Sequence, residues 1–254
     1  MSSRVPRTLF SWLDVLAIAA WGILFLKYWV TGKLFLLIHP NYIWLTIIAG
    51  FVLLVLAGIR AVTLFRRARR GERIGGSATQ HLTLFPPGWS SALLLATAIL
   101  GLLISPRAFA SQTAIDRGVN DTLTMTRVKP QAFRGIQESE DKSIVDWIRT
   151  LTVYPEPDAY TGQKAKVQGF VTYPPNLPDQ YLLISRFVIT CCAADVYPVS
   201  LPVKLSQSRK AYKPDTWLEI EGQMITETLS EKRQLVIAAT GIKEISEPKN
   251  PYDY

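Results

Sequence analysis

Long apolar runs, rather than alternating apolar and polar positions, occupy most of the first 110 residues. Three of them can be distinguished, over residues 12–30, 42–62 and 89–106, and each presents apolar side chains around most of a helix. A helix that crosses lipid needs about 20 such residues, since its polar backbone groups must bond to one another there. The pattern therefore predicts a transmembrane region over residues 1–110 with three spans, of which the third is marginal in length.

The first apolar run has a second interpretation, as a cleaved secretory signal peptide. A short basic segment with Arg4 and Arg7 precedes it, as is usual for such peptides. No small-x-small cleavage site follows, however, and further apolar sequence comes at once. We therefore favour an uncleaved anchor, with Asp14 near its start and Lys27 near its end.

The segment between the first two runs, residues 31–41, is also apolar but is interrupted by Gly32 and Pro40. We expect a short segment at the membrane surface there, with His39 shaping a turn before Pro40 rather than binding a metal. Aromatic side chains flank the segment, as is common where a membrane meets water: Tyr28, Trp29, Tyr42 and Trp44.

The pattern changes after residue 110. Residues 111–137 are mostly polar and show no sustained period, which predicts a linker. Residues 138–151 carry apolar side chains on one helical face and acidic residues at the start, so they predict an amphipathic helix. Pro155 and Pro157 follow and are expected to end it.

Five segments with strand-like alternation fill the rest of the chain: residues 162–172, 181–190, 197–205, 217–226 and 233–245. Gly169 and Gly222 interrupt two of them, which predicts a bend or a bulge in each strand. Five short, bent strands are typical of a small closed barrel of the OB type, and a β-sandwich fragment is the alternative. We therefore predict an α+β membrane protein, whose transmembrane region leads through the linker and helix into an OB-like β-barrel domain over residues 138–254.

Charge is distributed unevenly between the two halves of the chain. The net charge is +8, but residues 1–114 carry 11 basic and 2 acidic side chains, whereas residues 115–254 carry 17 and 18. A nucleic-acid-binding domain needs positive charge on the folded surface that meets the phosphates. Because the predicted β domain is close to neutral and lacks a basic groove with interleaved aromatic residues, we expect no nucleic-acid partner.

The basic side chains of the first half predict the orientation. Five of them lie between the second and third spans: Arg66, Arg67, Arg69, Arg70 and Arg73. Such clusters favour the cytoplasmic side, and two crossings separate this loop from Arg4 and Arg7, which agree with it. We therefore predict a multi-pass protein of the plasma (inner) membrane, in contact with its lipid, with a cytoplasmic N-terminus. Three crossings then place the C-terminal domain outside the cytoplasm.

The only two cysteines, Cys191 and Cys192, are adjacent at the end of an apolar run. Four hypotheses are open: they fill space in the core, bind a soft metal ion together with Asp195, form a strained redox-active disulfide, or act as a nucleophile. We disfavour catalysis and expect no enzyme, because a catalytic cysteine needs a nearby histidine and both histidines, His39 and His81, precede the β domain.

The metal hypothesis has a weakness of its own. A closed zinc site takes four ligands, and this segment supplies at most three, so a partner or a second copy would have to complete it. Asp195 has a second interpretation as a residue that caps a turn. Arg186, shortly before the cysteines, is more naturally an ion-pairing residue than a ligand contact.

Several short segments, taken in chain order, resemble one known family. They are residues 31–34 and 38–40 after the first span, residues 169–171, residues 186–187 with 191–195, Trp217 with Gly222, and the tail 248–252. On these segments the chain resembles the YcgQ-like family of predicted permease subunits, and Cys-Cys-Ala-Ala-Asp at 191–195 is the most specific of them. The resemblance marks His39, Arg186 and Trp217 as motif residues besides the cysteines.

Members of that family are often encoded beside a multi-span permease, so the resemblance implies such a partner here. It implies a non-enzymatic accessory subunit, anchored in the membrane, and leaves the transported substrate open. The alternative is a stand-alone membrane-anchored protein that binds metal or undergoes thiol redox chemistry through Cys191 and Cys192.

Overall fold

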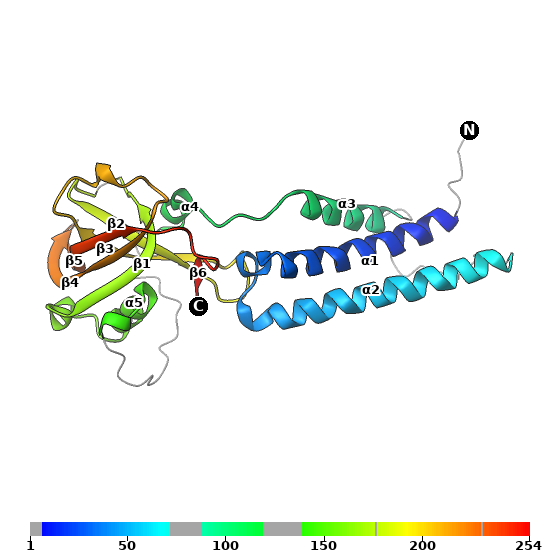
Figure 1. Ribbon diagram of the computed structural model, residues 1–254, viewed down its shortest axis with the longest axis horizontal. Coiled ribbons are helices and arrows are strands. Elements are labelled where there is room, and N and C mark those ends of the chain that lie inside the picture. Colours follow the sequence, from blue (N-terminus) through cyan, green and yellow to red (C-terminus); the bar gives the residue numbers. More distant parts are fainter. Residues whose placement is uncertain (1–6, 72–87, 119–138, 176, 230) are drawn as a thin grey trace. The chain divides into compact units, whose positions relative to one another are not determined.

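The computed structural model divides into two compact units, Met1–Arg107 and Ala108–Tyr254, which we call the helical unit and the β unit. The residues that the structure describes are 7–71, 88–118, 139–175, 177–229 and 231–254. Figure 1 shows the course of the chain through the helices of the first unit and the strands of the second.

The helical unit contains three apolar helices, α1 (Arg7–Val30), α2 (Pro40–Arg69) and α3 (Trp89–Leu103), with a short 3-10 turn at Lys33–Leu36 between the first two. By length and composition, α1 (from Leu9) and α2 could cross a membrane. α3 is apolar but has 15 residues, so it is about 22 Å long against a hydrocarbon thickness of about 30 Å. The structure therefore shows two helices of spanning length among the described residues, not the three that the sequence predicts.

Polar side chains of α1 set its alignment with α3. Asp14, Trp21 and Tyr28 are spaced seven residues apart, so they share one helical face. The Ser91 hydroxyl donates to the Asp14 carboxylate, the Trp21 indole donates to the carbonyl oxygen of Leu94 at 3.0 Å, and the Tyr28 hydroxyl donates to carbonyls at the end of α3. The partners advance along both helices together, so α1 and α3 run parallel.

The β unit begins with α4 (Ser111–Asp116) and α5 (Ile144–Val153) and continues with six strands. These are β1 (Lys164–Thr172), β2 (Tyr181–Val188), β3 (Tyr197–Lys204), β4 (Trp217–Leu229), β5 (Lys232–Glu244) and β6 (Tyr252–Asp253). They form one sheet in the order β1-β4-β5-β3-β2-β6, and β1 also pairs with β2, so β1 has a neighbour on each side. The β3–β5 and β2–β6 pairs are parallel and the others antiparallel.

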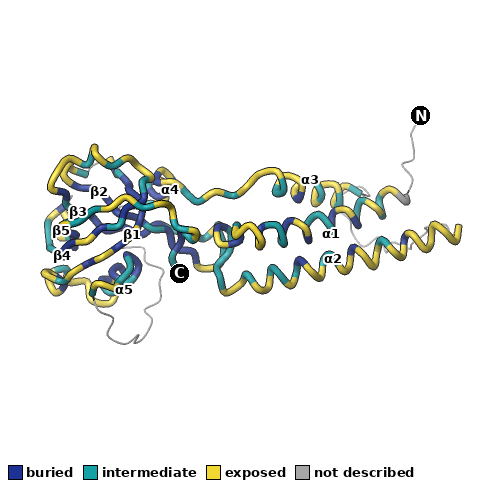
Figure 2. Tube along the Cα trace, in the orientation of Figure 1, coloured by how far each residue is buried: buried dark blue, intermediate teal, exposed yellow. Residues whose placement is uncertain are grey.

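The core of the β unit forms because alternate strand residues turn to one side. In β1 these are Ala165, Val167 and Val171, and α5 adds Trp147, which is fully buried. α5 begins with a capping box, in which Ser143 accepts from the Asp146 N–H and Asp146 accepts from the Ser143 N–H. Figure 2 shows the buried residues of the β unit gathered within its strands and on α5.

The two predicted mid-strand glycines occupy positions without space for a side chain. A Cβ at Gly222 would lie 2.2 Å from the carbonyl oxygen of Ala238, and the β4–β5 register shifts between Glu221 and Gly222. The predicted bend or bulge in that strand is thus present as a shift of register. A Cβ at Gly169 would lie 2.5 Å from the carbonyl oxygen of Ser185, so this glycine permits a close approach of β1 and β2.

Two elements were not predicted. α4 lies within the predicted linker, of which residues 119–137 fall outside the described residues, and its Ala114 is fully buried in the β unit. The Ser111 N–H, at the start of α4, donates to Asp215 Oδ1 at 2.5 Å. The second element, β6, belongs to the tail and pairs with the end of β2.

Candidate functional site

The two cysteines lie in a turn beyond the end of β2, which the sequence placed two residues later than the structure does. Cys191 is exposed and Cys192 is half-buried. The carboxylate of Asp195 accepts from the main-chain N–H of Cys191 at 2.7 Å and from those of Thr190 and Cys192 at 3.3 Å each. Asp195 therefore holds the turn that carries the thiols, because it collects three donors that no strand partner satisfies.

This arrangement keeps the first thiol protonated at neutral pH. Hydrogen bonding to Asp195, and then to Cys192, raises the pKa of Cys191 to about 11. Partial burial works against the charged form of Asp195, but hydrogen bonds from Thr190 and Cys191 outweigh it and lower the pKa of that carboxyl. The thiolate is the nucleophile and the metal ligand, so either kind of chemistry must first remove the Cys191 proton.

The turn also brings the Cys191 thiol within hydrogen-bonding reach of the Cys192 side chain. In a strand, adjacent side chains would point to opposite faces. Here the Cys191 thiol interacts with both Cys192 and Asp195. Within the described part of the chain, no group of three or more His, Cys, Asp or Glu side chains is arranged to hold a metal ion. A soft metal at Cys191, Cys192 and Asp195 stays a prediction.

A second cluster gathers motif residues from distant parts of the β unit. The Arg186 guanidinium lies over the Trp217 ring, 5.1 Å from its centroid. Its Nε is 3.8 Å from Asp253 Oδ2, and one terminal nitrogen is 3.5 Å from the carbonyl oxygen of Asn250. Arg186 therefore connects β2 with the tail. Its neighbour Phe187 packs against the rings of residues 170, 109 and 252, at centroid distances of 5.3, 5.6 and 6.4 Å.

His39 takes no part in either group, because it belongs to the helical unit. It is the N-cap of α2, where its Nδ1 accepts from the Asn41 N–H at 3.1 Å. Its position before Pro40, the first residue of the helix, explains why a side-chain acceptor is needed there.

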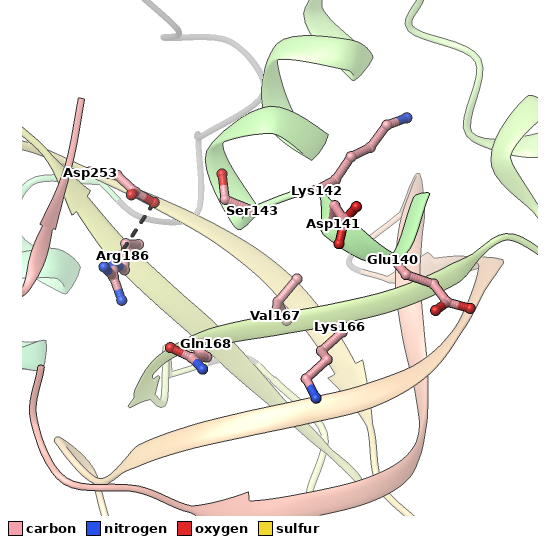
Figure 3. Close-up of a pocket in the computed structure, with 9 residues that line it drawn as sticks. All are labelled: Glu140, Asp141, Lys142, Ser143, Lys166, Val167, Gln168, Arg186 and Asp253. Atoms are coloured by element: carbon pink, nitrogen blue, oxygen red, sulfur yellow. Dashed lines mark ion pairs between the residues drawn. The ribbon is translucent and has the colours of Figure 1, made fainter. Parts of the chain in front are cut away.

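A hollow of about 280 Å³ lies beside Arg186 (Figure 3). Its walls come from the segment before α5, from β1, β2 and β6: Glu140, Asp141, Lys142, Ser143, Lys166, Val167, Gln168, Arg186 and Asp253. The Arg186 side chain is 13% exposed and that of Asp253 is 28% exposed. Burial is the largest influence on both, and it lowers the pKa of Arg186 and raises the pKa of Asp253.

Sequence reasoning singled out Arg186 but missed Asp253, Ser143 and Gln168. Ser143 could have been found, since a serine three residues before Asp146 at the start of an apolar helix is a capping-box pattern. Asp253 follows the tail motif directly and gave no signal of its own, because its role depends on a parallel pairing between β6 and β2.

Comparison with known proteins identifies both halves of the chain. Residues 13–120 match the DUF1980 N-terminal domain, and residues 124–254 match the DUF1980 C-terminal domain. The searches of curated proteins and of solved structures found no match. The narrower resemblance to YcgQ-like permease subunits, with its cysteine motif, stays a prediction. Since the two domain models together cover nearly all of the sequence, the chain belongs to the DUF1980 family.

Proposed function

We propose that this protein is a non-enzymatic, membrane-anchored accessory subunit of a multi-span permease, with its β domain outside the cytoplasm. The observation that carries the membrane part is the apolar exterior of the helical unit, where side chains such as Trp44, Val55 and Leu103 are at least 60% exposed. Such a surface is stable against lipid and not against water. The permease partner is supported by the resemblance of the sequence motifs.

Three crossings are supported by the parallel alignment of α1 and α3. A helix that runs parallel to α1 and bonds to it at Asp14, Trp21 and Tyr28 shares its depth and direction in the bilayer. The shortness of α3 is offset if the bilayer thins around it. At the C-terminal end of α3, the Lys27 ammonium of α1 donates to the carbonyl of Leu102, which places a charged group where the membrane surface would be.

The arginines support the orientation. α2 has 30 residues and is therefore about 45 Å long, so it exceeds the hydrocarbon layer by roughly three turns. Its last turn carries Arg66, Arg67 and Arg69. A cytoplasmic position suits this end, since anionic lipid headgroups on that side attract arginine.

The strand pairing supports an OB-like barrel in the β domain. Following the pairs from β1 through β4, β5, β3 and β2 leads back to β1. A sheet that closes in this way removes its free edges, and the bulge at Gly222 supplies curvature that closure needs. The barrel presents the cysteine turn between its second and third strands.

Co-purification tests the permease assignment. The tagged full-length chain is extracted from native membranes in mild detergent, and an unrelated tagged protein with three spans is the control. We expect mass spectrometry to identify a multi-span protein that is enriched in the purification of this chain and not in that of the control. If no multi-span protein is enriched over the control, the subunit proposal loses its support.

Reporter fusions test the topology separately. Alkaline phosphatase, which is active only outside the cytoplasm, is fused after Gly71 in the arginine loop or after Tyr254. We expect activity from the Tyr254 fusion and none from the Gly71 fusion. The reverse pattern, or activity from neither, would contradict the orientation.

A second candidate function is favoured by the exposure of Cys191 beside the half-buried Cys192. A stand-alone membrane-anchored redox or metal-binding protein needs accessible cysteines close to each other, as Cys191 and Cys192 are. In the redox form, a disulfide such as oxidised glutathione accepts two electrons and two protons from the pair. The products are a Cys191–Cys192 disulfide and two molecules of the reduced thiol.

The thiol hypothesis is tested on the full-length chain with oxidised glutathione and, separately, with Zn²⁺. In the redox case the peptide with both cysteines loses the mass of two hydrogen atoms, whereas Cys192→Ser forms a mixed disulfide with glutathione. In the metal case Zn²⁺ binds the native chain and not the Cys191→Ser or Cys192→Ser variant. If the native chain neither forms the disulfide nor binds Zn²⁺, the proposal of redox or metal chemistry at the cysteine pair is wrong.

A further inference from the structure

The hollow beside Arg186 exists because β1 and β2 pair over a short distance. Their pairs run only from Phe170 with Ser185 to Thr172 with Leu183. Nearer its start, residues 164–168, β1 pairs with β4, while the end of β2 pairs with β3 and β6. The hollow takes part of its wall from each strand at the place where they separate (Figure 3).

Arg186 is the most buried charge on this wall, and its hydrogen-bonding capacity is barely used. A guanidinium has five N–H donors, and bonds to carboxylates are normally about 2.7–2.9 Å long. Here the contacts with Asn250 and Asp253 measure 3.5 and 3.8 Å, and among the residues that the structure describes the buried Nε finds no hydrogen-bond partner. The ring of Trp217 fixes the plane of the group. A buried cation in this state needs further acceptors.

Several charges around the hollow are neutralised by partners outside it. Glu140 pairs with Lys164 at 2.8 Å, and Lys166 pairs with Glu221 at 2.7 Å. Figure 3 shows the Glu140 carboxylate and the Lys166 ammonium directed away from Arg186. These residues form a rim with no net charge.

The facing wall favours an anion. Ser143 is the N-cap of α5, so the hollow lies at the positive end of a ten-residue helix. Gln168 lies on the β1 wall near Arg186 in Figure 3. The opposing groups are the carboxylates of Asp141 and Asp253 on the wall and that of Asp146, which accepts from Ser143 at the same end of the helix. Since a water molecule takes up about 30 Å³, the volume of about 280 Å³ has room for a small organic acid or a phosphate.

We propose that this hollow binds the oxyanion of a small molecule, a carboxylate or a phosphate group, on the guanidinium of Arg186. Two oxygen atoms of the ligand accept from the guanidinium, as its fork geometry allows. Asp253 is then the internal competitor: its carboxylate partly neutralises Arg186 when the hollow holds only water. The proposal concerns the β unit and is independent of the permease assignment.

Calorimetric titration of the detergent-solubilised full-length chain tests it, with inorganic phosphate and with acetate at constant ionic strength. We expect saturable binding of at least one of them, with the tighter of the two showing the ligand class. Arg186→Gln should weaken binding about tenfold or more, since hydrogen bonds to a charged group are lost. Asp253→Asn should strengthen it severalfold, because the competing carboxylate is removed.

Arg209→Gln is the matched control. Arg209 also lies over an aromatic ring, that of Tyr173 at 4.9 Å, and pairs with an acidic residue, Asp179, at 3.4 Å. It does not line the hollow. We expect this variant to bind the probes as the native chain does.

The proposal is overturned if neither phosphate nor acetate binds saturably, either to the native chain or to Asp253→Asn. It is also overturned if Arg186→Gln and Arg209→Gln bind the probes equally well. Circular dichroism shows whether Arg186→Gln is folded. Should it unfold, Arg186→Lys keeps the positive charge but lacks the fork, and it must still weaken binding. Unchanged binding by a folded Arg186→Lys would also overturn it.

Discussion

The helical unit and the β unit place their apolar side chains in opposite ways. Among the described residues, large apolar side chains that are exposed belong to the helical unit, with two exceptions in the β unit, Val153 and Tyr154. Figure 2 shows this contrast along α2, where exposed residues predominate, and within the strands, where buried ones do. The same kinds of residue thus form the exterior of one unit and the core of the other, and the proposed membrane location gives the first kind a lipid environment.

Polar side chains show the opposite distribution: they bond between helices in the helical unit and lie on the surface of the β unit. In the helical unit, Asp14 and Trp21 bond across a helix interface, to Ser91 and to a main-chain carbonyl. In the β unit, ion pairs such as Arg233 with Asp158 lie on the surface, with side chains more than half exposed. If the helical unit lies in lipid, as proposed, its polar groups must find partners inside the protein, whereas water satisfies those on the surface of the β unit.

The largest effect on stability is expected when a large side chain is removed from the core of the β unit. Trp147 is fully buried, and its ring packs at 6.1 Å against that of Tyr160. Trp147→Ala should lower the free energy of unfolding of the β unit by about 4 kcal/mol, because the cavity cannot refill. Amide hydrogen exchange of the strands in the full-length chain measures this loss. Tyr154→Ala, at a 55% exposed position, is the control and should change little.

The next effect compares equal substitutions on the two surfaces. Val52 on α2 is 49% exposed, and Val153, the last residue of α5, is 64% exposed. Val52→Lys should oppose membrane insertion by about 3 kcal/mol, since a lysine would face hydrocarbon. Val153→Lys should change the free energy of unfolding of the β unit by less than about 0.5 kcal/mol and leave insertion unchanged, since the lysine would face water. The inserted fraction of each variant is measured after membrane fractionation, and equal behaviour of the two would remove the distinction between the surfaces.

This contrast explains how far the sequence predicted the fold. Continuous apolar runs and period-two alternation depend on the surroundings of each side chain, so α1, α2 and the five longer strands followed from pattern alone. A bend or a bulge was predicted at Gly222, because glycine weakens a strand interior and often marks such a site. The strand ends and the pairing of β6 depend on contacts with distant segments, which no local pattern encodes.

The candidate sites were predicted to different extents. Arg186 and Trp217 were marked as motif residues, but their stacking requires β2 and β4 to meet across β1. Asp195 was assigned two roles, and its three main-chain contacts are those of a turn-capping residue. Whether it also binds metal stays a prediction. Asp253 escaped notice because a single acidic residue near the end of the sequence has no distinguishing pattern.

A smaller effect tests the close approach of strands in the β unit. Gly222→Ala would place a methyl group 2.2 Å from the carbonyl oxygen of Ala238, so the backbone must move. We expect a loss of about 2 kcal/mol in the free energy of unfolding, measured by hydrogen exchange of β4 and β5. The control is Gly241→Ala, whose nearest contact would be 3.7 Å from Glu221. A Gly222→Ala variant as stable as Gly241→Ala would show that the bulge is not tightly packed.

The smallest change in stability is expected from a substitution in the turn that carries the cysteines, where the measured signal is the reactivity of Cys191. This turn belongs neither to the core of the β unit nor to the apolar exterior of the helical unit. Asp195→Asn keeps a side-chain oxygen for the main-chain donors but removes the charge that disfavours a thiolate. The pKa of Cys191 should then fall from about 11 toward its ordinary value near 9. At pH 9 the alkylation rate of Cys191 should rise at least about tenfold, because more of the thiol is ionised.

In the native chain the same rate should keep rising with pH until about 11. Fragment-ion mass spectrometry of the alkylated peptide assigns the signal to Cys191 rather than to Cys192. Asp179→Asn is the control, since that carboxylate is 67% exposed, lies in another loop and should leave the rate unchanged. An alkylation profile that Asp195→Asn does not shift would mean that the carboxylate holds the turn without restraining the thiol. Accessibility alone would then set the reactivity of the pair, and the turn would behave as an ordinary part of the water-facing surface.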